Sequence, residues 1–217
     1  MANHQSIKFS GMLNQHEFKE RFIFIMQRIE NGLSKEDIAF LLGRTSYHVI
    51  DYESFSDQVK MDYEDHEVMA ELFKTPLPAA PAFNSKVNKV DISMEKRMIR
   101  GSCIQTDKEL HYQFIHPWTI KGINEPLTIL KPIQSYARND VEVSHELRME
   151  FARLIDFGYF NNKSPAIAIY RHMQTHLIPD WQSLLVPALR QVVFEFISSE
   201  KLQLKNELGH IYYQTKL

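Results

Sequence analysis

The sequence has little cysteine, little glycine and no long hydrophobic run, and each shortage excludes a class of protein. The one cysteine, Cys103, cannot form a disulfide within the chain or a multi-cysteine zinc site. We interpret it as a buried, unreactive thiol. The seven glycines include no phosphate-binding loop, no Gly-x-Gly-x-x-Gly and no Gly-x-Ser-x-Gly. No catalytic residues and no cofactor are therefore predicted.

The apolar runs are also too short for a membrane protein. The longest, such as Ile23 to Met26, fall far below the roughly 20 residues that a membrane helix needs. No basic-then-apolar leader opens the chain, so we expect a cytoplasmic protein without membrane contact.

What the chain does contain is enough apolar residues to form a core. Its 217 residues are 44% hydrophobic, which suits one large or two small domains. The net charge of −2 is unevenly distributed, because the residues before Thr75 carry eight basic and thirteen acidic side chains. A surface that binds nucleic acid usually carries an excess of basic residues. The acidic balance of this first third favours contacts with protein over contacts with DNA.

The most informative segment is 32–53, which predicts two short helices joined by a tight turn. Ser34 is suited to cap the first helix, and Gly43 is suited to end it. Thr45 or Ser46 can cap the second helix. This arrangement is that of a helix-turn-helix.

The segment resembles the helix-turn-helix of the phage-repressor-like regulators, the family of lambda repressor, Cro and XRE. Ala39 falls where the two helices of this family cross, a position that needs a small side chain. The resemblance covers about the first third of the chain and implies an all-α DNA-binding domain. The positions in register with the family pattern are Gly32, Leu33, Ser34, Glu36, Ile38, Ala39, Leu42, Gly43, Thr45, Val49 and Glu53.

The same resemblance implies a set of DNA-contacting residues. Base edges would be read by Ser46, Tyr47, Ile50 and Asp51, while Arg44 and Thr45 lie near the backbone and Lys35 at a phosphate. Family members usually carry arginine, glutamine, lysine or asparagine at the base-reading positions, and this chain departs from that pattern. If it binds DNA, we expect four cations to gather near the recognition face: Arg21, Arg28, Lys35 and Arg44.

Prolines mark the expected domain boundary. Segment 75–89 contains three prolines, which predicts a linker. We therefore expect a helix-turn-helix domain over 1–74, with further helices around 18–29 and 61–73. Residues 90–217 would form an α+β domain for sensing, dimerisation or partner binding.

The second domain is expected to begin with a small antiparallel sheet and to end in helices and a hairpin. The predicted strands are 96–105, 110–116 and 127–131, and the predicted helices are 143–157, 165–175 and 180–199. Pro187 would kink the last helix or start a new one. A hairpin at 202–205 and 210–214 follows. Three helices before a hairpin is a winged-helix-like order, which other α+β domains share. The predicted fold class is mainly α with a small antiparallel sheet.

Two histidines and a tryptophan are further candidate site residues. His172 and His176 lie four apart on a predicted helix, so that both imidazoles share one face. Zinc would need a third ligand, which the sequence does not indicate, and we interpret both as solvated or capping residues. No metal is predicted. Trp118 can be an exposed binding anchor, but core packing is the favoured interpretation.

Two functions remain open at this point. The register of the motif favours a transcriptional regulator that binds double-stranded DNA as a homodimer, because one recognition helix contacts few base pairs. The acidic balance favours a protein-interaction module, such as an immunity, antitoxin-like or phage-derived adaptor protein. In that case the helix-turn-helix would have lost its DNA-binding face.

Overall fold

The computed structural model describes residues 5–74, 94–106, 109–118, 125–132, 141–176 and 182–216. Within these ranges the chain is a mixed α+β protein with seven α-helices and two antiparallel sheets. It forms two compact units. The first unit consists of Met1–Asn31 and Ile50–Gln134, and the second consists of Gly32–Val49 and Ser135–Leu217. In the described part of the chain, every helix is too short or too polar to span a bilayer.

The first unit is built on a four-stranded sheet in the order β1-β2-β3-β4. Its strands are β1 (Gln5–Leu13), β2 (Arg97–Gln105), β3 (Glu109–Ile115) and β4 (Leu127–Pro132), all antiparallel. Gly101 pairs with Phe9 across β1 and β2. A Cβ at Gly101 would lie 2.1 Å from the Phe9 ring, so glycine lets the ring keep this position over the backbone.

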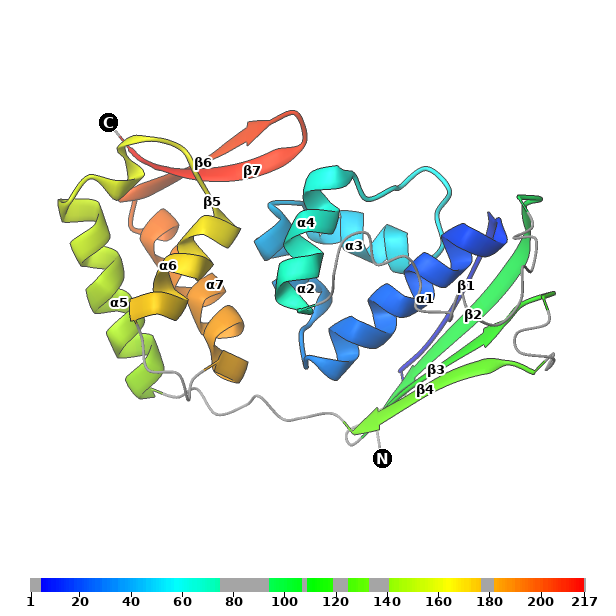
Figure 1. The fold of residues 1–217 in the computed structure, drawn as a ribbon. Helices are drawn as coiled ribbons and strands as arrows, with labels where there is room; N and C mark the ends of the chain where they lie inside the picture. Colours follow the sequence, from blue (N-terminus) through cyan, green and yellow to red (C-terminus); the bar gives the residue numbers. More distant parts are fainter. Residues whose placement is uncertain are drawn as a thin grey trace. The chain divides into compact units, whose positions relative to one another are not determined.

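Helix α1 (Gln15–Glu30) runs along one face of this sheet (Figure 1). Asn14 starts α1 with a reciprocal capping box to Glu17. Phe18 packs its ring 6.3 Å from Phe114 of β3, with the two rings edge to face. Helix α4 (Tyr63–Leu72), capped by Asp62, belongs to the same unit.

The second unit contains α2 (Lys35–Leu42), α5 (Val141–Asp156), α6 (Ala166–His176) and α7 (Gln182–Ser198). A short 3-10 turn at Tyr159–Asn161 and strand β5 (Ser164–Pro165) connect α5 to α6. Strands β6 (Leu202–Glu207) and β7 (His210–Thr215) form a hairpin, and the sheet order is β5-β7-β6. The hairpin lies at one end of α5, α6 and α7 (Figure 1). Buried core side chains of this unit include Leu147, Phe151, Phe160, Ile169, Leu189 and Val193.

Helix α3 (Ser46–Glu53) crosses the division, because its first turn belongs to the second unit and the remainder to the first. Both helices predicted between Ser34 and Ser54 are confirmed. The hairpin near the C-terminus is confirmed as well. Pro187 lies inside α7, which continues through it as one helix.

The N-terminal third is not all-α, and this expectation was wrong. Residues 5–13 form β1, whose register with β2 extends from Gln5 opposite Gln105 to Leu13 opposite Arg97. The described residues also divide differently from the expected domains 1–74 and 90–217, because β1 pairs with β2 while α2 packs in the second unit. The expected linker 75–89 lies outside the described residues.

Candidate functional site

The helix-turn-helix segment begins with a doubly capped helix. The Ser34 amide donates to Asp37 Oδ2 at 3.0 Å, and the Asp37 amide donates to Ser34 Oγ at 3.1 Å. This capping box satisfies two amides that the first turn leaves without a helical partner. Ala39 is buried, as a helix-crossing position requires.

Gly43 ends α2 in the left-handed conformation, with φ at +65°. The amide of Arg44 donates to the Ala39 carbonyl at 2.8 Å, which closes the C-terminal turn. The Gly43 carbonyl accepts from the Ile211 amide of β7 at 2.6 Å. A Cβ on Gly43 would lie 3.0 Å from the Ile211 carbonyl oxygen, so the backbone conformation and the close contact both favour glycine.

The predicted DNA-contacting residues differ in exposure. Thr45, Ser46 and Tyr47 are exposed at the start of α3, and Tyr47 is 76% exposed. Lys35, Arg44 and Ile50 are half-buried, and Asp51 is exposed. Ile50 and Asp51 fall on the part of α3 that belongs to the first unit, whereas the other five lie in the second unit. The exposed first turn of α3 is therefore the part of this set that a ligand can reach most easily.

The tip of the β6-β7 hairpin contacts the turn between α2 and α3. Arg44 Nη1 donates to the Gly209 carbonyl at 3.4 Å, and the neighbouring Leu208 is fully exposed. The sequence indicated a hairpin turn near 206–209 but gave no sign that it would meet the turn after α2. The contact joins residues 165 positions apart, so no local pattern could have indicated it.

Two of the four cations expected near the recognition face are buried instead. Arg21 donates to the backbone carbonyls of Tyr52, Ser56 and Val59 at 2.7–2.8 Å. Burial lowers the pKa of Arg21, although nearby acidic groups oppose the shift. These three hydrogen bonds fix the end of α3 and the chain that follows it, so Arg21 does not face solvent.

Arg28 has a similar structural role. Its guanidinium forms an ion pair with Glu53 and donates to the Tyr112 hydroxyl at 3.3 Å. Burial alone would lower the pKa of Arg28, but the adjacent Glu53 carboxylate outweighs it and the pKa is raised. The expectation that Arg21 and Arg28 line a phosphate-facing surface was wrong, because both satisfy buried polar groups.

The outer face of the β1-β4 sheet is a second exposed surface. Lys8 and Arg100 border a hollow of about 450 Å³ that Ser10, Ser102 and Gln113 also line. Several large apolar side chains of the sheet are 38–60% exposed: Met12, Met98, Ile104, Ile115 and Leu130. Such a group on one surface is typical of a site that another molecule covers.

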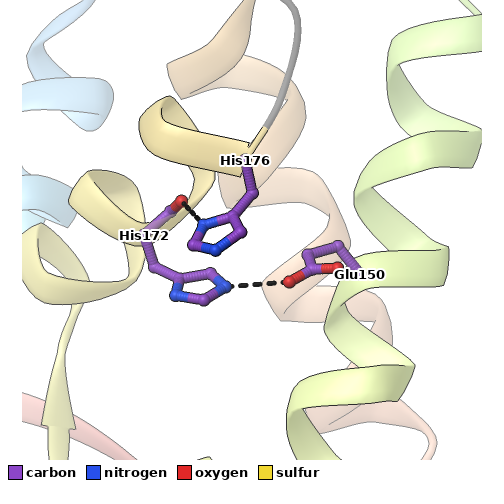
Figure 2. Close-up of side chains that lie close together, drawn as sticks. All are labelled: Glu150, His172 and His176. Atoms are coloured by element: carbon purple, nitrogen blue, oxygen red, sulfur yellow. Dashed lines mark hydrogen bonds and ion pairs between the residues drawn. The ribbon is translucent and has the colours of Figure 1, made fainter.

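The structure adds a third residue to the histidine pair of α6. His172 Nε2 lies 2.8 Å from Glu150 Oε1 of α5, and the rings of His172 and His176 are stacked with centroids 4.0 Å apart (Figure 2). These three are the residues of the described chain that could together hold a metal ion. Sequence spacing identified the histidines but could not identify Glu150, which lies on another helix.

The other candidate residues of the sequence are core residues. Trp118 is buried with its ring 5.8 Å from that of Phe18, which confirms core packing. The Cys103 thiol is buried, also as expected.

Comparison of the chain with protein families, with curated proteins and with solved structures gives no match.

Proposed function

We propose that the protein is a DNA-binding regulator that contacts double-stranded DNA through α2, the turn after it and the start of α3. The observation that carries this proposal is the exposed first turn of α3, at Thr45, Ser46 and Tyr47, directly after a helix that ends at Gly43. In helix-turn-helix proteins the N-terminal residues of the second helix contact base edges. The resemblance of 32–53 to the phage-repressor-like regulators supports the same assignment.

The C-terminal elements support an extended contact surface. Their order of α5, β5, α6, α7, β6 and β7, with β7 between β5 and β6, fits a winged-helix arrangement. The hydrogen bond from Arg44 to Gly209 joins the hairpin tip to the turn of the helix-turn-helix. We infer that the hairpin acts as a wing beside this turn, and that two copies bind a twofold-symmetric DNA site.

A gel-shift titration on random-sequence duplex DNA at low salt tests the proposal. Asp51→Arg replaces a repulsive charge by an attractive one, and at 0.1 M salt this acts over a Debye length of about 10 Å. Affinity should therefore rise if α3 approaches the duplex. Glu146→Arg makes the same charge change on an exposed position of α5 and serves as the control. Equal increases for the two variants would mean that α3 is not the contact surface.

Lys35 provides an independent measurement. If Lys35 contacts a phosphate, Lys35→Ala weakens binding to all duplexes alike and lowers the salt slope by about one. A change in base preference with an unchanged salt slope would contradict the assigned role.

A second candidate function, a protein-interaction module, is favoured by the exposed apolar side chains on the outer face of the sheet. Tyr47, a largely exposed aromatic residue, would be a natural anchor for a partner. This function is the correct one if Asp51→Arg shows no DNA binding and Tyr47→Ala abolishes co-purification of a protein partner.

A further inference from the structure

We propose that Glu150, His172 and His176 form a binding site for a divalent transition-metal ion of the zinc class. One ligand atom from each residue lies within 4.8 Å of those of the other two. In a tetrahedral zinc site with metal–ligand bonds of about 2.0–2.1 Å, neighbouring ligand atoms are about 3.4 Å apart. Small side-chain rotations are enough to bring the three ligand atoms from within 4.8 Å of one another to the spacing of about 3.4 Å.

The hydrogen bonds of His176 leave one ring nitrogen for a metal. Its Nδ1 lies 2.8 Å from the His172 carbonyl oxygen and 2.9 Å from Thr175 Oγ1. Because the carbonyl oxygen can only accept, we assign the ring proton to Nδ1. The Nε2 atom then keeps its lone pair, and Figure 2 shows it on the side of the ring that faces His172 and Glu150. Metal-binding histidines commonly donate their other ring N–H to a backbone carbonyl in this way.

The remaining two residues share a proton that a metal can replace. His172 Nε2 and Glu150 Oε1 are 2.8 Å apart, and the side chains are 21% and 11% exposed. Arg153 Nη1 lies 3.5 Å from the other carboxylate oxygen of Glu150, Oε2, which orients the carboxylate and leaves Oε1 to the site. A dication in place of the shared proton would attract the Glu150 carboxylate more strongly than an imidazole N–H donor does.

The ligand set identifies the class of ion. Imidazole nitrogens suit zinc and its first-row neighbours, whereas Mg²⁺ and Ca²⁺ prefer oxygen ligands alone. Two histidines and one glutamate are a zinc ligand set that leaves the fourth position open. Because His176 is exposed, that position is accessible to water or to a small ligand. The site uses only α5 and α6 and does not depend on the proposed DNA-binding function.

The test is a metal titration of the full chain after treatment with a chelator. Zn²⁺ binding is measured by competition with a chromophoric chelator, and Co²⁺ binding by its visible absorption. We expect one ion per chain, and affinity at least about tenfold weaker in His176→Ala and in Glu150→Gln. His145→Ala removes an exposed histidine of α5 outside the cluster and should bind as the unmodified chain does.

Circular dichroism of the metal-free variants separates loss of a ligand from loss of the fold. Zn²⁺ should also raise the melting temperature of the unmodified chain and not that of a folded His176→Ala. The proposal is overturned if the unmodified chain binds no stoichiometric Zn²⁺. It is equally overturned if folded His176→Ala and Glu150→Gln bind Zn²⁺ as tightly as His145→Ala does.

Discussion

At the scale of single residues, the ion pair of Arg28 with Glu53 is almost completely buried, with side chains 6% and 1% exposed. Removing two charges from water is costly, and the cost is recovered only while both partners are present. Tyr112 completes the cluster, and burial is the main cause of its raised pKa, with Glu53 adding to it. The three groups connect α1, α3 and β3 within the first unit.

Glu53→Gln leaves the Arg28 cation buried without its counter-charge. The free energy of unfolding, measured by urea denaturation, should fall by about 3–5 kcal/mol. The matched control is Glu195→Gln, which breaks the ion pair of Glu195 with Arg148, where both side chains are about 40% exposed. Exposed pairs contribute about 1 kcal/mol or less. Similar losses in the two variants would contradict a structural role for the buried pair.

A second residue pair predicts how stability changes with pH. Glu20 Oε1 lies 2.9 Å from His66 Nε2 and accepts from the Tyr52 hydroxyl at 2.9 Å. The bond to Glu20 is the main reason that the pKa of His66 is raised. Burial acts to raise the pKa of Glu20, but its bonds to His66 and Tyr52 outweigh burial, and the pKa is lowered.

The signs of the two shifts define a pH window. A raised histidine pKa contributes stability that is present below its ordinary value of about 6.5 and is lost as pH rises through the folded pKa. A lowered glutamate pKa contributes stability above about 4.3 that is lost as pH falls further. His66→Gln should therefore lower the melting temperature most between about pH 4.3 and 6.5. His145→Gln is the control, and a pH-independent difference for His66→Gln would contradict the pair.

At the scale of elements, the turn after α2 is fixed twice, by the left-handed conformation of Gly43 and by its contact with Ile211. A side chain in the left-handed region costs about 1–2 kcal/mol per residue. Gly43→Ala should cost at least this much in urea denaturation, because the added Cβ also crowds the Ile211 carbonyl. Gly32→Ala is the control, since Gly32 has a φ of +67° but is only half-buried. A smaller loss at Gly43 than at Gly32 would mean that the contact with β7 is not tight.

The elements also show what can be predicted from the sequence. Helical periodicity and capping residues indicated α2, α3, α5, α6 and α7, because these signals are local. Strand β1 was not predicted. Its residues Ile7, Phe9 and Leu13 alternate with polar residues or methionine, but its partner strand β2 lies about 90 residues further along the chain. Glu150 was not predicted as a neighbour of His172 and His176 for the same reason. Pairs formed through the fold, such as Arg44 with Gly209, leave no local pattern.

At the scale of the whole molecule, the two units interleave along the chain. Residues 1–74 therefore contain incomplete portions of both units. We predict that a fragment 1–74 does not unfold cooperatively, because β1 lacks β2 and α2 lacks α6 and α7. Circular dichroism during urea titration measures this. A cooperative transition with native-like helix content would instead support an independent N-terminal domain.

The pairing of β1 with β2 also has a consequence for protein synthesis. At about 5–20 residues per second, the ribosome needs roughly 5–20 s to make the chain between these strands. During this time β1 emerges with unpaired backbone groups and exposed Phe9 and Leu13. Helix α2 lacks its packing partners α6 and α7 for longer still, because these helices are made later. Neither unit can therefore be completed when its first elements have just been made. Chaperones that shield nascent apolar segments should raise the yield of native protein more than they do for a chain whose domains are completed in sequence order.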